Sequence, residues 1–433
     1  MHRKNFMQRN CAALAAAFLL AAALLSACGS NTEANATSDT SIESSSSASI
    51  SSGASDTGSA SAAEGDPENQ SENSGPESAV KNASEDGSAA SEEASAEEES
   101  SADEASAAAN AAAAKAASAD ASSSQSTELF AMDTVMTLTA YGSNAQAGLD
   151  AATKEINRLD QLFSISSETG DIYRANRDGE GDLSADSASL LQSALFYAAQ
   201  TNGLFEPSIE PVMRAWGFTT KNYRVPSEDE LQELLSHVDY KKVQLSGSHV
   251  KLPAGMQLDL GGIAKGYTSA RVIDVFKESG VTSGIISLGG NVQALGTKPD
   301  GSRWRVGIQD PNNLNDTFAI VEVADEAVIT SGTYQRYFEQ DGKIYHHIID
   351  PRTGYPSDSG LTSVSIISKD GTRADALSTS LFIMGADAAA DFWKAHRDEF
   401  DTIMMDKSDT VYVTAGLADR CTVTGGKEIK IIQ

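Results

Sequence analysis

Long hydrophobic runs are scarce in this sequence. The apolar, Ala- and Leu-rich segment Cys11–Leu25 is shorter than the roughly 20 residues that a membrane-spanning helix needs. Arg3, Lys4 and Arg9 precede it, and a basic segment followed by a short apolar one is typical of an export signal. We therefore expect residues 1–27 to be a signal peptide.

Small residues follow the apolar segment and lead into a cysteine, in the order Leu25-Ser26-Ala27-Cys28-Gly29. This is the bacterial lipobox pattern, which predicts cleavage before Cys28 and a diacylglyceryl thioether on its sulfur. The alternative is an ordinary signal peptide with an incidental cysteine. A lipid on Cys28 would hold a soluble chain at a membrane, so we expect a lipid-anchored protein on the extracytoplasmic face of the cell membrane.

Cysteine is equally scarce, with three in 433 residues. Cys11 leaves with the signal peptide and Cys28 carries the lipid, which leaves Cys421 alone. No intramolecular disulfide can then form in the mature protein, so its stability must come from the core.

Positive charge is also in short supply. The chain has 32 Lys and Arg against 61 Asp and Glu, a net charge of −29, which argues against nucleic-acid binding. Residues Gly29–Thr127 hold 19 acidic and 2 basic residues and no aromatic residue. Such a segment cannot bury enough apolar surface to offset chain entropy. We predict that residues 28–127 form a disordered acidic tether that begins at the lipidated Cys28.

The remaining segment, residues 128–433, is long enough for a sizeable core and shows no repeat of fixed period. Within residues 145–162, apolar residues recur at helical spacing at Leu149, Ala152, Ile156 and Leu159, which predicts an amphipathic helix. Further helices are expected at 188–201, 263–278 and 374–382, and strands at 135–141, 285–288, 304–308, 319–323, 327–330 and 363–367. Because helices and strands do not alternate regularly, we expect an α+β fold with a mixed sheet.

A polar motif runs from His346 to Pro356 and is followed by the segment Ala374–Thr379. Together they contain imidazoles, carboxylates, hydroxyls and a turn, the groups that a metal-assisted phosphoryl transfer needs. His347 could contact a phosphate or a ring, and in an extended chain its neighbour His346 would point the other way. The combination favours an enzyme.

Asp375 and Thr379 are four residues apart, so on a helix they face the same side. A carboxylate and a hydroxyl placed in this way can bind a hard cation such as Mg²⁺, with substrate phosphates completing the octahedron. The alternative is that Asp375 caps a helix beginning near Ala376, and a cap can also be a metal ligand.

Three glycine- or hydroxyl-rich junctions follow predicted strands. Asp259–Tyr267 places two glycines and Lys265 where a strand runs into a helix, and the free N–H groups at such a start can bind a phosphate. The alternative is a tight turn before the helix. Ser287–Asn291 is a second junction of a strand with glycines, and its alternative interpretation is a plain hairpin turn. Thr330–Tyr334 adds hydroxyls after another strand. Several such junctions could converge at one edge of a sheet, where backbone amides would face a polyphosphate.

The ordered set of motifs resembles the FAD:protein FMN transferases, also called ApbE proteins or flavin transferases. Each motif is ordinary alone, but their order along the chain is specific. The resemblance implies an ApbE-like catalytic domain over residues 128–433, which transfers the FMN half of FAD to a Ser or Thr hydroxyl of another protein and releases AMP, with Mg²⁺ on the pyrophosphate. The matching motifs are Met132-Asp133-Thr134, Gly203–Ser208, Trp216-Gly217-Phe218, Asp259–Tyr267, Ser287–Asn291, Trp304–Pro311, Thr330–Tyr334, His347–Pro356 and Asp375–Thr379.

The resemblance also implies roles for individual residues. Asp375 and Thr379 match side-chain metal ligands, and Gly262 matches a position that binds the metal through its backbone carbonyl. Asp375 or His347 would accept the hydroxyl proton of the acceptor. Many relatives carry an aromatic residue that stacks on the flavin, and Ser166 stands at that place in this sequence. The residues that match flavin-nucleotide contacts or line the pocket are Met132, Leu204, Phe205, Glu206, Asp259, Lys265 and His347.

Three functions are compatible with these residues. The first is a transferase acting on an exported or membrane redox protein, such as a flavinylated subunit of an Rnf- or Nqr-type complex or an extracellular electron-transfer lipoprotein. The second is a Mg²⁺-dependent FAD pyrophosphatase that uses water as acceptor and yields FMN and AMP, which Ser166 favours. The third is a non-catalytic flavin-binding lipoprotein. The Asp375 and Thr379 pair weighs against the third, because binding of FAD alone does not require a metal.

Overall fold

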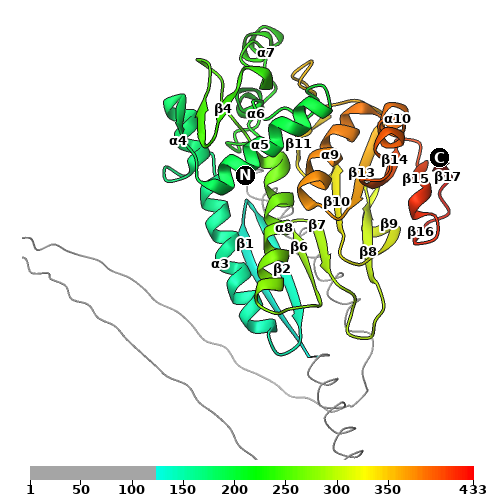
Figure 1. Ribbon diagram of the computed structural model, residues 1–433. Coiled ribbons are helices and arrows are strands. Elements are labelled where there is room, and N and C mark those ends of the chain that lie inside the picture. Colours follow the sequence, from blue (N-terminus) through cyan, green and yellow to red (C-terminus); the bar gives the residue numbers. More distant parts are fainter. Residues whose placement is uncertain (1–122) are drawn as a thin grey trace, which may run out of the picture. The chain divides into compact units, whose positions relative to one another are not determined.

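The computed structural model describes residues 123–433 (Figure 1). The predicted signal peptide, Cys28 and nearly all of the predicted tether lie outside the described residues. No helix between residues 123 and 433 combines the length and the apolar character needed to cross a membrane. The fold is α+β, as the sequence predicts.

A nine-stranded sheet forms the centre of the part of the chain that the structure describes, in the order β1-β2-β6-β7-β10-β13-β14-β15-β17. Its neighbouring strands are antiparallel except β15 and β17, which run parallel, so the sheet is mixed. Its strands are β1 (Ser124–Ala131), β2 (Thr134–Tyr141), β6 (Gly284–Leu288), β7 (Asn291–Leu295), β10 (Ala327–Gly332), β13 (Leu361–Ser368), β14 (Asp401–Asp406), β15 (Val411–Thr414) and β17 (Ile429–Ile432).

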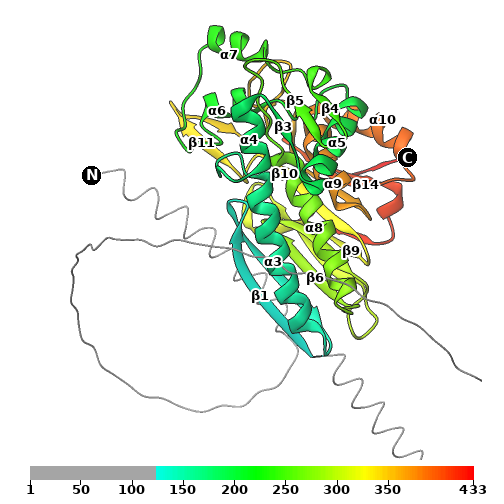
Figure 2. The same cartoon turned by 60° about the vertical axis from the view of Figure 1, so that its left-hand side comes forward.

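The central strands of the sheet, such as β10 and β13, are buried on both faces. Helices α3 (Ala145–Phe163), α8 (Gly261–Glu278) and α9 (Gly371–Met384) cover one face, as Figures 1 and 2 show. A small sheet of β8 (Trp304–Asp310), β9 (Asn313–Val323) and β16 (Cys421–Val423) packs on the other. Successive side chains of a strand point to opposite faces. Accordingly Met404 belongs to the core under the helices, and its neighbours Ile403 and Met405 to the core under β8 and β9.

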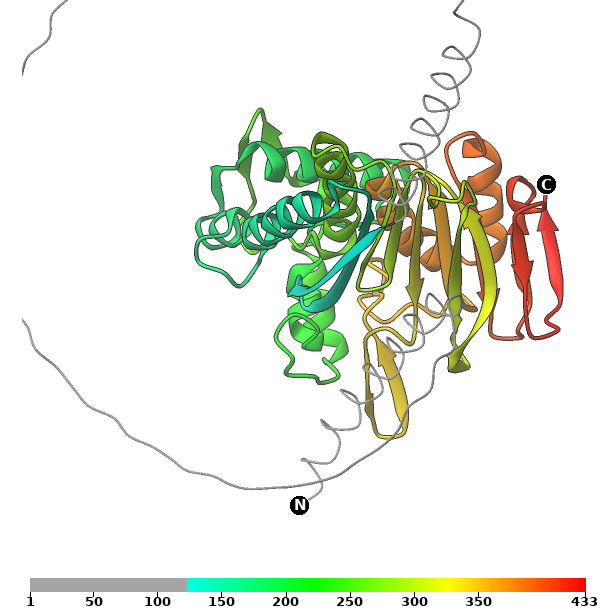
Figure 3. The ribbon, with the colours of Figure 1, turned by 90° about the horizontal axis from the view of Figure 1, so that it is seen from below.

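A smaller set of elements lies beyond one end of the main sheet. An aromatic cluster that includes Trp216, Phe218 and Phe338 joins the hairpin of β11 (Tyr337–Gln340) and β12 (Lys343–His346) to α6 (Glu210–Trp216). The hairpin extends from the body of the fold in Figure 3. The remaining elements are α4 (Asp171–Asp178), β3 (Glu180–Asp182), α5 (Ala185–Gln200), α7 (Glu228–Leu235), β4 (Gln244–Ser246), β5 (His249–Lys251), α10 (Ala386–His396) and the 3₁₀ helices Tyr240–Lys242 and Ala415–Leu417.

The predicted elements are confirmed, with shifts at their ends. In α3 the four apolar residues that predicted the helix are all buried. α9 begins at Gly371, three residues before its predicted start, because the side chain of Asp370 accepts hydrogen bonds from Thr372 N and Arg373 N. The alternative role of Asp375 as the helix cap is therefore wrong, since Asp375 lies in the second turn.

Two glycines allow α8 and α9 to approach closely. A Cβ on Gly266 would lie 2.3 Å from the Gly371 carbonyl oxygen and 2.5 Å from Asp375 Cβ. A Cβ on Gly371 would lie 2.8 Å from the Gly266 carbonyl oxygen and 2.6 Å from Ser269 Oγ. No L side chain fits at either position unless the helices separate. The contact places the second turn of α9 against the second turn of α8.

We predict that Gly266→Ala destabilises the protein, although alanine is normally the better helix former. Overpacking a close contact costs about 1–3 kcal/mol, which exceeds the helix-propensity gain. The measurement is the urea midpoint of unfolding. Gly181→Ala is the matched control, because a Cβ at Gly181 meets nothing within 4 Å. Equal midpoints for the two variants would contradict the glycine contact.

Candidate active site

Several strand ends meet at one edge of the main sheet, as the sequence predicts. Residues 132–133 connect β1 to β2, and Gly289 and Gly290 connect β6 to β7. The register of the antiparallel pairs places the end of β10 and the start of β13 at the same edge, with Gly332 opposite Ser363. The segment Ser287–Asn291 is thus the plain hairpin that was the alternative interpretation, but its Asn291 also contributes a side chain to the site.

α8 starts beside this edge. Gly261 N donates to Asp259 Oδ1 at 2.8 Å, which fixes the carboxylate against the first turn of the helix. Burial raises the pKa of Asp259, and the Gly261 N–H, Arg336 and Lys265 oppose the rise. The expectation of a strand before this helix is wrong, because the residues preceding α8 form a single β-bridge, between Ile209 and Gln257.

Asp375 is held between α8 and the edge of the sheet. It is 5% exposed, its Oδ2 accepts from Gly266 N at 2.7 Å, and its Oδ1 accepts from Asn291 Nδ2 at 3.0 Å. Burial raises the pKa of this carboxyl, and Lys265, the Gly266 N–H and Asn291 oppose the rise. Gly266 and Asn291 are 109 and 84 residues from Asp375, so no local sequence pattern indicated these hydrogen bonds. The two hydrogen bonds fix the direction of the carboxylate.

The other two predicted metal ligands, Thr379 and Gly262, lie on the two helices that meet at Asp375. Thr379 is one turn further along α9, with Oγ1 3.3 Å from Ser331 Oγ. Gly262 is one turn before Gly266, whose N–H donates to Asp375. A carbonyl oxygen has two lone pairs, so the Gly262 carbonyl has acceptor capacity for a cation. Carboxylate, hydroxyl and carbonyl oxygens suit Mg²⁺, so this donor set fits the metal.

A metal centre built from several His, Cys, Asp or Glu side chains is absent from the described part of the chain. Residues 123–433 contain no group of three or more His, Cys, Asp or Glu side chains placed to hold an ion. The predicted set has one carboxylate, so its remaining ligands would have to come from carbonyl, hydroxyl, substrate and water oxygens.

His347 is neutral and oriented. Its Nδ1 lies 3.1 Å from the carbonyl oxygen of Arg336, and because a carbonyl only accepts, Nδ1 must carry the proton. The pKa of His347 is lowered to about 3, chiefly by burial and also by the cations of Arg336 and Lys265. His346 contacts other groups, since its Nε2 lies 3.0 Å from Ser357 O and its ring lies against Phe382. The two histidines thus diverge, as expected for an extended chain.

The turn that carries Met132 is strained. Met132 and Asp133 have φ angles of 49° and 61°, in the left-handed region that glycine or asparagine usually occupies. Met132 N donates to Asp160 Oδ1 at 3.0 Å. Asp133 forms ion pairs with Lys221 Nζ at 2.6 Å and Arg336 Nη2 at 3.2 Å. This turn therefore connects three chain segments around the site, a role of Asp133 that no sequence pattern indicated.

The three predicted pocket residues that follow α5, Leu204, Phe205 and Glu206, contact different parts of the structure. The Phe205 ring lies against Gly262, where an added Cβ would lie 3.2 Å from it. Leu204 lines a cavity of about 440 Å³ together with Arg352 and Phe392. The carboxylate of Glu206 already has partners within the protein, because Oε1 accepts from Ser208 N and Oγ and Oε2 accepts from Tyr240 N. Burial raises the pKa of Glu206.

Ser166 follows the C-terminus of α3 and is exposed. Its backbone N–H donates to Ser164 Oγ at 3.2 Å, within a group of serines that closes the turn. The side chain at this position is small, and it presents no ring on which a flavin could stack.

The fold of this chain is shared with solved ApbE structures. The Thermotoga maritima ApbE protein is 31% identical and superposes with a TM-score of 0.65, covering 68% of this chain and 98% of that one. The Pseudomonas stutzeri flavinyl transferase ApbE, in its apo form, is 27% identical with a TM-score of 0.60, covering 66% of this chain and 92% of that one.

Sequence comparisons identify the family. Residues 132–404 match the ApbE family. A Treponema pallidum protein named FAD:protein FMN transferase is 34% identical over 323 residues, which cover 67% of this chain and 86% of that protein. A Klebsiella pneumoniae protein of the same name is 32% identical over 269 residues, covering 60% and 82%. The chain belongs to the ApbE family, as the ordered motifs predict.

We predict that the His347 ring stays neutral down to about pH 4 in the ligand-free protein. Its pKa of about 3 lies below the ordinary value of 6.5, so protonation begins only as the pH falls towards the lower figure. The ¹⁵N chemical shifts of the ring would report one protonated nitrogen, Nδ1, throughout that range. Titration near pH 6.5 would contradict the burial of this ring beside two cations.

Proposed function

We propose that this chain is an FAD:protein FMN transferase, which moves the FMN half of FAD to a Ser or Thr hydroxyl of another protein with the help of Mg²⁺. The names of its relatives support the transfer. The observation that carries the proposal is the buried Asp375, fixed by Gly266 and Asn291 one helical turn from Thr379.

The reaction exchanges one phosphorus–oxygen bond for another. The acceptor hydroxyl oxygen forms a bond to the phosphorus of the FMN half, and the bond from that phosphorus to the bridging oxygen breaks. AMP leaves with the bridging oxygen, and the hydroxyl proton passes to a base. Positioning and charge neutralisation supply most of the catalysis in such a transfer.

Gly262, Asp375 and Thr379 would hold the metal ion. Bound Mg²⁺ would neutralise pyrophosphate charge and orient the reacting group. Lys265 adds positive charge on the same side, because its cation lowers the pKa of both Asp375 and His347. Arg336, which is held by Asp133, contributes a second cation.

His347 is the better candidate for the proton acceptor. Both oxygens of Asp375 already accept hydrogen bonds, whereas the Nδ1 proton of His347 points to Arg336 O and leaves the Nε2 lone pair for a substrate. A pKa of about 3 makes a weak base. The pyrophosphate would neutralise the two cations that contribute to this low value, so we expect FAD to raise the pKa of His347 towards the range of a useful base.

The acceptor we propose is an exported or membrane redox protein, such as an Rnf- or Nqr-type subunit or an extracellular electron-transfer lipoprotein. The lipobox at Cys28 and the basic, apolar segment before it support a lipid-anchored enzyme on the extracytoplasmic face. The acidic stretch between Cys28 and the catalytic domain would give that domain reach.

A second activity has one specific observation in its favour. Ser166 is small and exposed at the place where relatives carry an aromatic residue, so a flavin would lack a stacking partner there. Looser placement of FAD would favour water over a protein hydroxyl, which gives a Mg²⁺-dependent FAD pyrophosphatase.

The direct test incubates the chain with FAD, Mg²⁺ and a protein that carries a family-type acceptor threonine. The readouts are the intact mass of the acceptor and the amounts of FMN and AMP. An FMN-sized mass gain that EDTA prevents would support the transferase. Free FMN and AMP without a mass gain would indicate the pyrophosphatase, and unchanged FAD would contradict both.

We predict that His347→Gln and Asp375→Asn lower the transfer rate for different reasons. His347→Gln removes the base and should reduce the rate by about 10²–10⁴-fold while FAD still binds. Asp375→Asn should also weaken the dependence of the rate on Mg²⁺ concentration. His249→Gln, a change in an exposed histidine paired with Asp182, is the control and should leave the rate unchanged. Normal turnover by His347→Gln would reject His347 as the base.

We predict that Cys28→Ala releases the protein from the membrane. The substitution removes the thiol that would carry the diacylglyceryl group, whose acyl chains are the proposed link to the bilayer. The measurement is the share of the protein in the membrane fraction of cells expressing each form. An unchanged share for Cys28→Ala would show that the anchor is wrong.

A further inference from the structure

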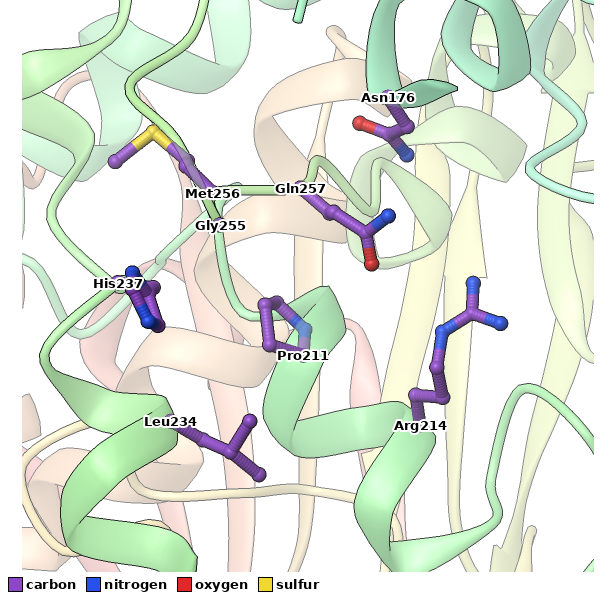
Figure 4. A pocket seen from close by; sticks show the side chains of 8 residues that line it. All are labelled: Asn176, Pro211, Arg214, Leu234, His237, Gly255, Met256 and Gln257. Carbon is purple, nitrogen blue, oxygen red and sulfur yellow. The ribbon is translucent and has the colours of Figure 1, made fainter. Parts of the chain in front are cut away.

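A cavity of about 420 Å³ lies beside the segment that leads to Asp259, and it is lined by residues other than those predicted to bind FAD or the metal (Figure 4). It is bounded by α4, α6, the end of α7 and the segment before α8. The volume falls in the range of small-ligand sites, which combine an apolar lining with a few polar groups. None of the residues for which the family resemblance implies a role lines this cavity.

The cavity has a polar and an apolar part. Figure 4 shows Arg214 and Gln257 pointing towards each other on one side, with Leu234 and His237 on the opposite side. The amide of Asn176 is committed to the backbone, because it donates to Leu258 O at 2.8 Å and accepts from Leu258 N at 2.6 Å. Asn176 therefore fixes the wall, and Arg214 and Gln257 remain to contact a ligand.

The apolar part is built by close packing. Gly255 has a φ of +82°, and an added Cβ would lie 2.6 Å from the ring of His237. The missing side chain lets the imidazole lie flat against the backbone. Pro211, Leu234 and Met256 supply the rest of the apolar lining.

A buried carboxyl holds Arg214 in place. Arg214 Nη2 lies 2.7 Å from Oε1 of Glu210, whose side chain is fully buried, whereas the Arg214 side chain is 49% exposed. Within residues 123–433, Oε2 of Glu210 has no hydrogen-bond partner. A buried oxygen without a partner costs more in an anion than in a protonated carboxyl. The contact with Oε1, which a neutral carboxyl also accepts, orients the guanidinium before any ligand arrives and so reduces the entropy cost of binding.

The protonation of Glu210 decides the charge of the site. The pKa of Glu210 is raised to about 8, chiefly by burial and also by the carboxylate of Asp259, while Arg214 and the hydroxyl of Thr219 oppose the rise. With Glu210 protonated, its contact with Arg214 is a hydrogen bond to a neutral acid, and the positive charge of Arg214 is not compensated.

We infer that this cavity binds a carboxylate on a short apolar stem, with Arg214 as the binding cation. The planar guanidinium matches a carboxylate in geometry, and the Gln257 amide offers a further donor. Pro211, Leu234 and Met256 would surround the stem. A phosphate carries more negative charge, which Asp259 on the neighbouring segment would repel. The ligand is either an acidic side chain of a partner protein or a small organic acid, which share this chemistry.

The experiment follows the methyl group of Met256 in the full chain by ¹³C NMR. Met256 is 3% exposed and lines the cavity, so its methyl shift reports occupancy. The probe is sodium butanoate at pH 6.5, and butanamide is the uncharged control of nearly the same shape. We expect a saturable shift with butanoate and at least tenfold weaker binding of butanamide. No saturable shift, or equal affinities for the two, would overturn the inference.

Variants identify the binding cation. Arg214→Gln should weaken butanoate binding at least tenfold. Arg177→Gln, which alters an exposed arginine of α4 that is paired with Asp178, should leave it unchanged. Gln257→Glu keeps the size of the lining, adds a repelling charge and should weaken binding by a similar factor. It serves as the second test if Arg214→Gln does not fold. If Arg214→Gln folds and binds butanoate with unchanged affinity, the site is refuted. If Arg214→Gln does not fold, unchanged butanoate affinity in Gln257→Glu refutes it.

Two further probes separate the possible sources of the carboxylate. They are glutarate and the capped peptide acetyl-Ala-Glu-Ala-amide. Tighter binding of the peptide would identify an acidic side chain of a partner protein. Tighter binding of glutarate would identify a small organic acid. Binding of neither, with butanoate also silent, would reject the site.

Discussion

The contact between Gly266 and Gly371 is the constraint on which the candidate site depends. Without side chains at these two positions, α8 and α9 approach until the Gly266 N–H donates to Asp375. That bond fixes the carboxylate of Asp375 one turn along α8 from Gly262. One close helix crossing thereby positions all three proposed metal ligands, two on α9 and one on α8.

The main sheet supplies the second part of the arrangement. Its antiparallel strands bring the β1–β2 turn, the β6–β7 turn and the end of β10 to one edge, so Asn291 and Ser331 reach the side chains of α9. The β11–β12 hairpin, fixed by the aromatic cluster around Trp216 and Phe338, carries Arg336 at its base. The carbonyl of Arg336 orients His347 and its guanidinium pairs with Asp133. Strain at the Met132–Asp133 turn is offset by these ion pairs and by Asp160.

Local sequence patterns predicted most of the fold. Helical spacing of Leu149, Ala152, Ile156 and Leu159 was sufficient for α3, because a helix buries residues that are near each other in the chain. The start of α9 was misplaced because the capping role of Asp370 was not recognised. The motifs were enough to identify the family, because they follow one another along the chain in the family's order.

The partners within the site were beyond such patterns. The hydrogen bonds of Asp375 span 109 and 84 residues, and the pair of Asp133 with Arg336 spans 203. Only the crossing of α8 with α9 and the strand register bring these groups together. One of the hydrogen bonds to Glu206 likewise comes from Tyr240, 34 residues away. Glu210 and Arg214 have the i,i+4 spacing of a helical pair, but the burial of Glu210 depends on tertiary packing that this spacing does not show.

The central claim is that the α8–α9 crossing builds a metal site for the FAD pyrophosphate. A crystal structure of the protein with FAD and Mn²⁺, which replaces Mg²⁺ and scatters anomalously, tests it most directly. We predict an anomalous peak bound by Asp375, Thr379 and the Gly262 carbonyl, with pyrophosphate oxygens as further ligands. A peak elsewhere, or a pyrophosphate bound without any metal at these residues, would contradict the account.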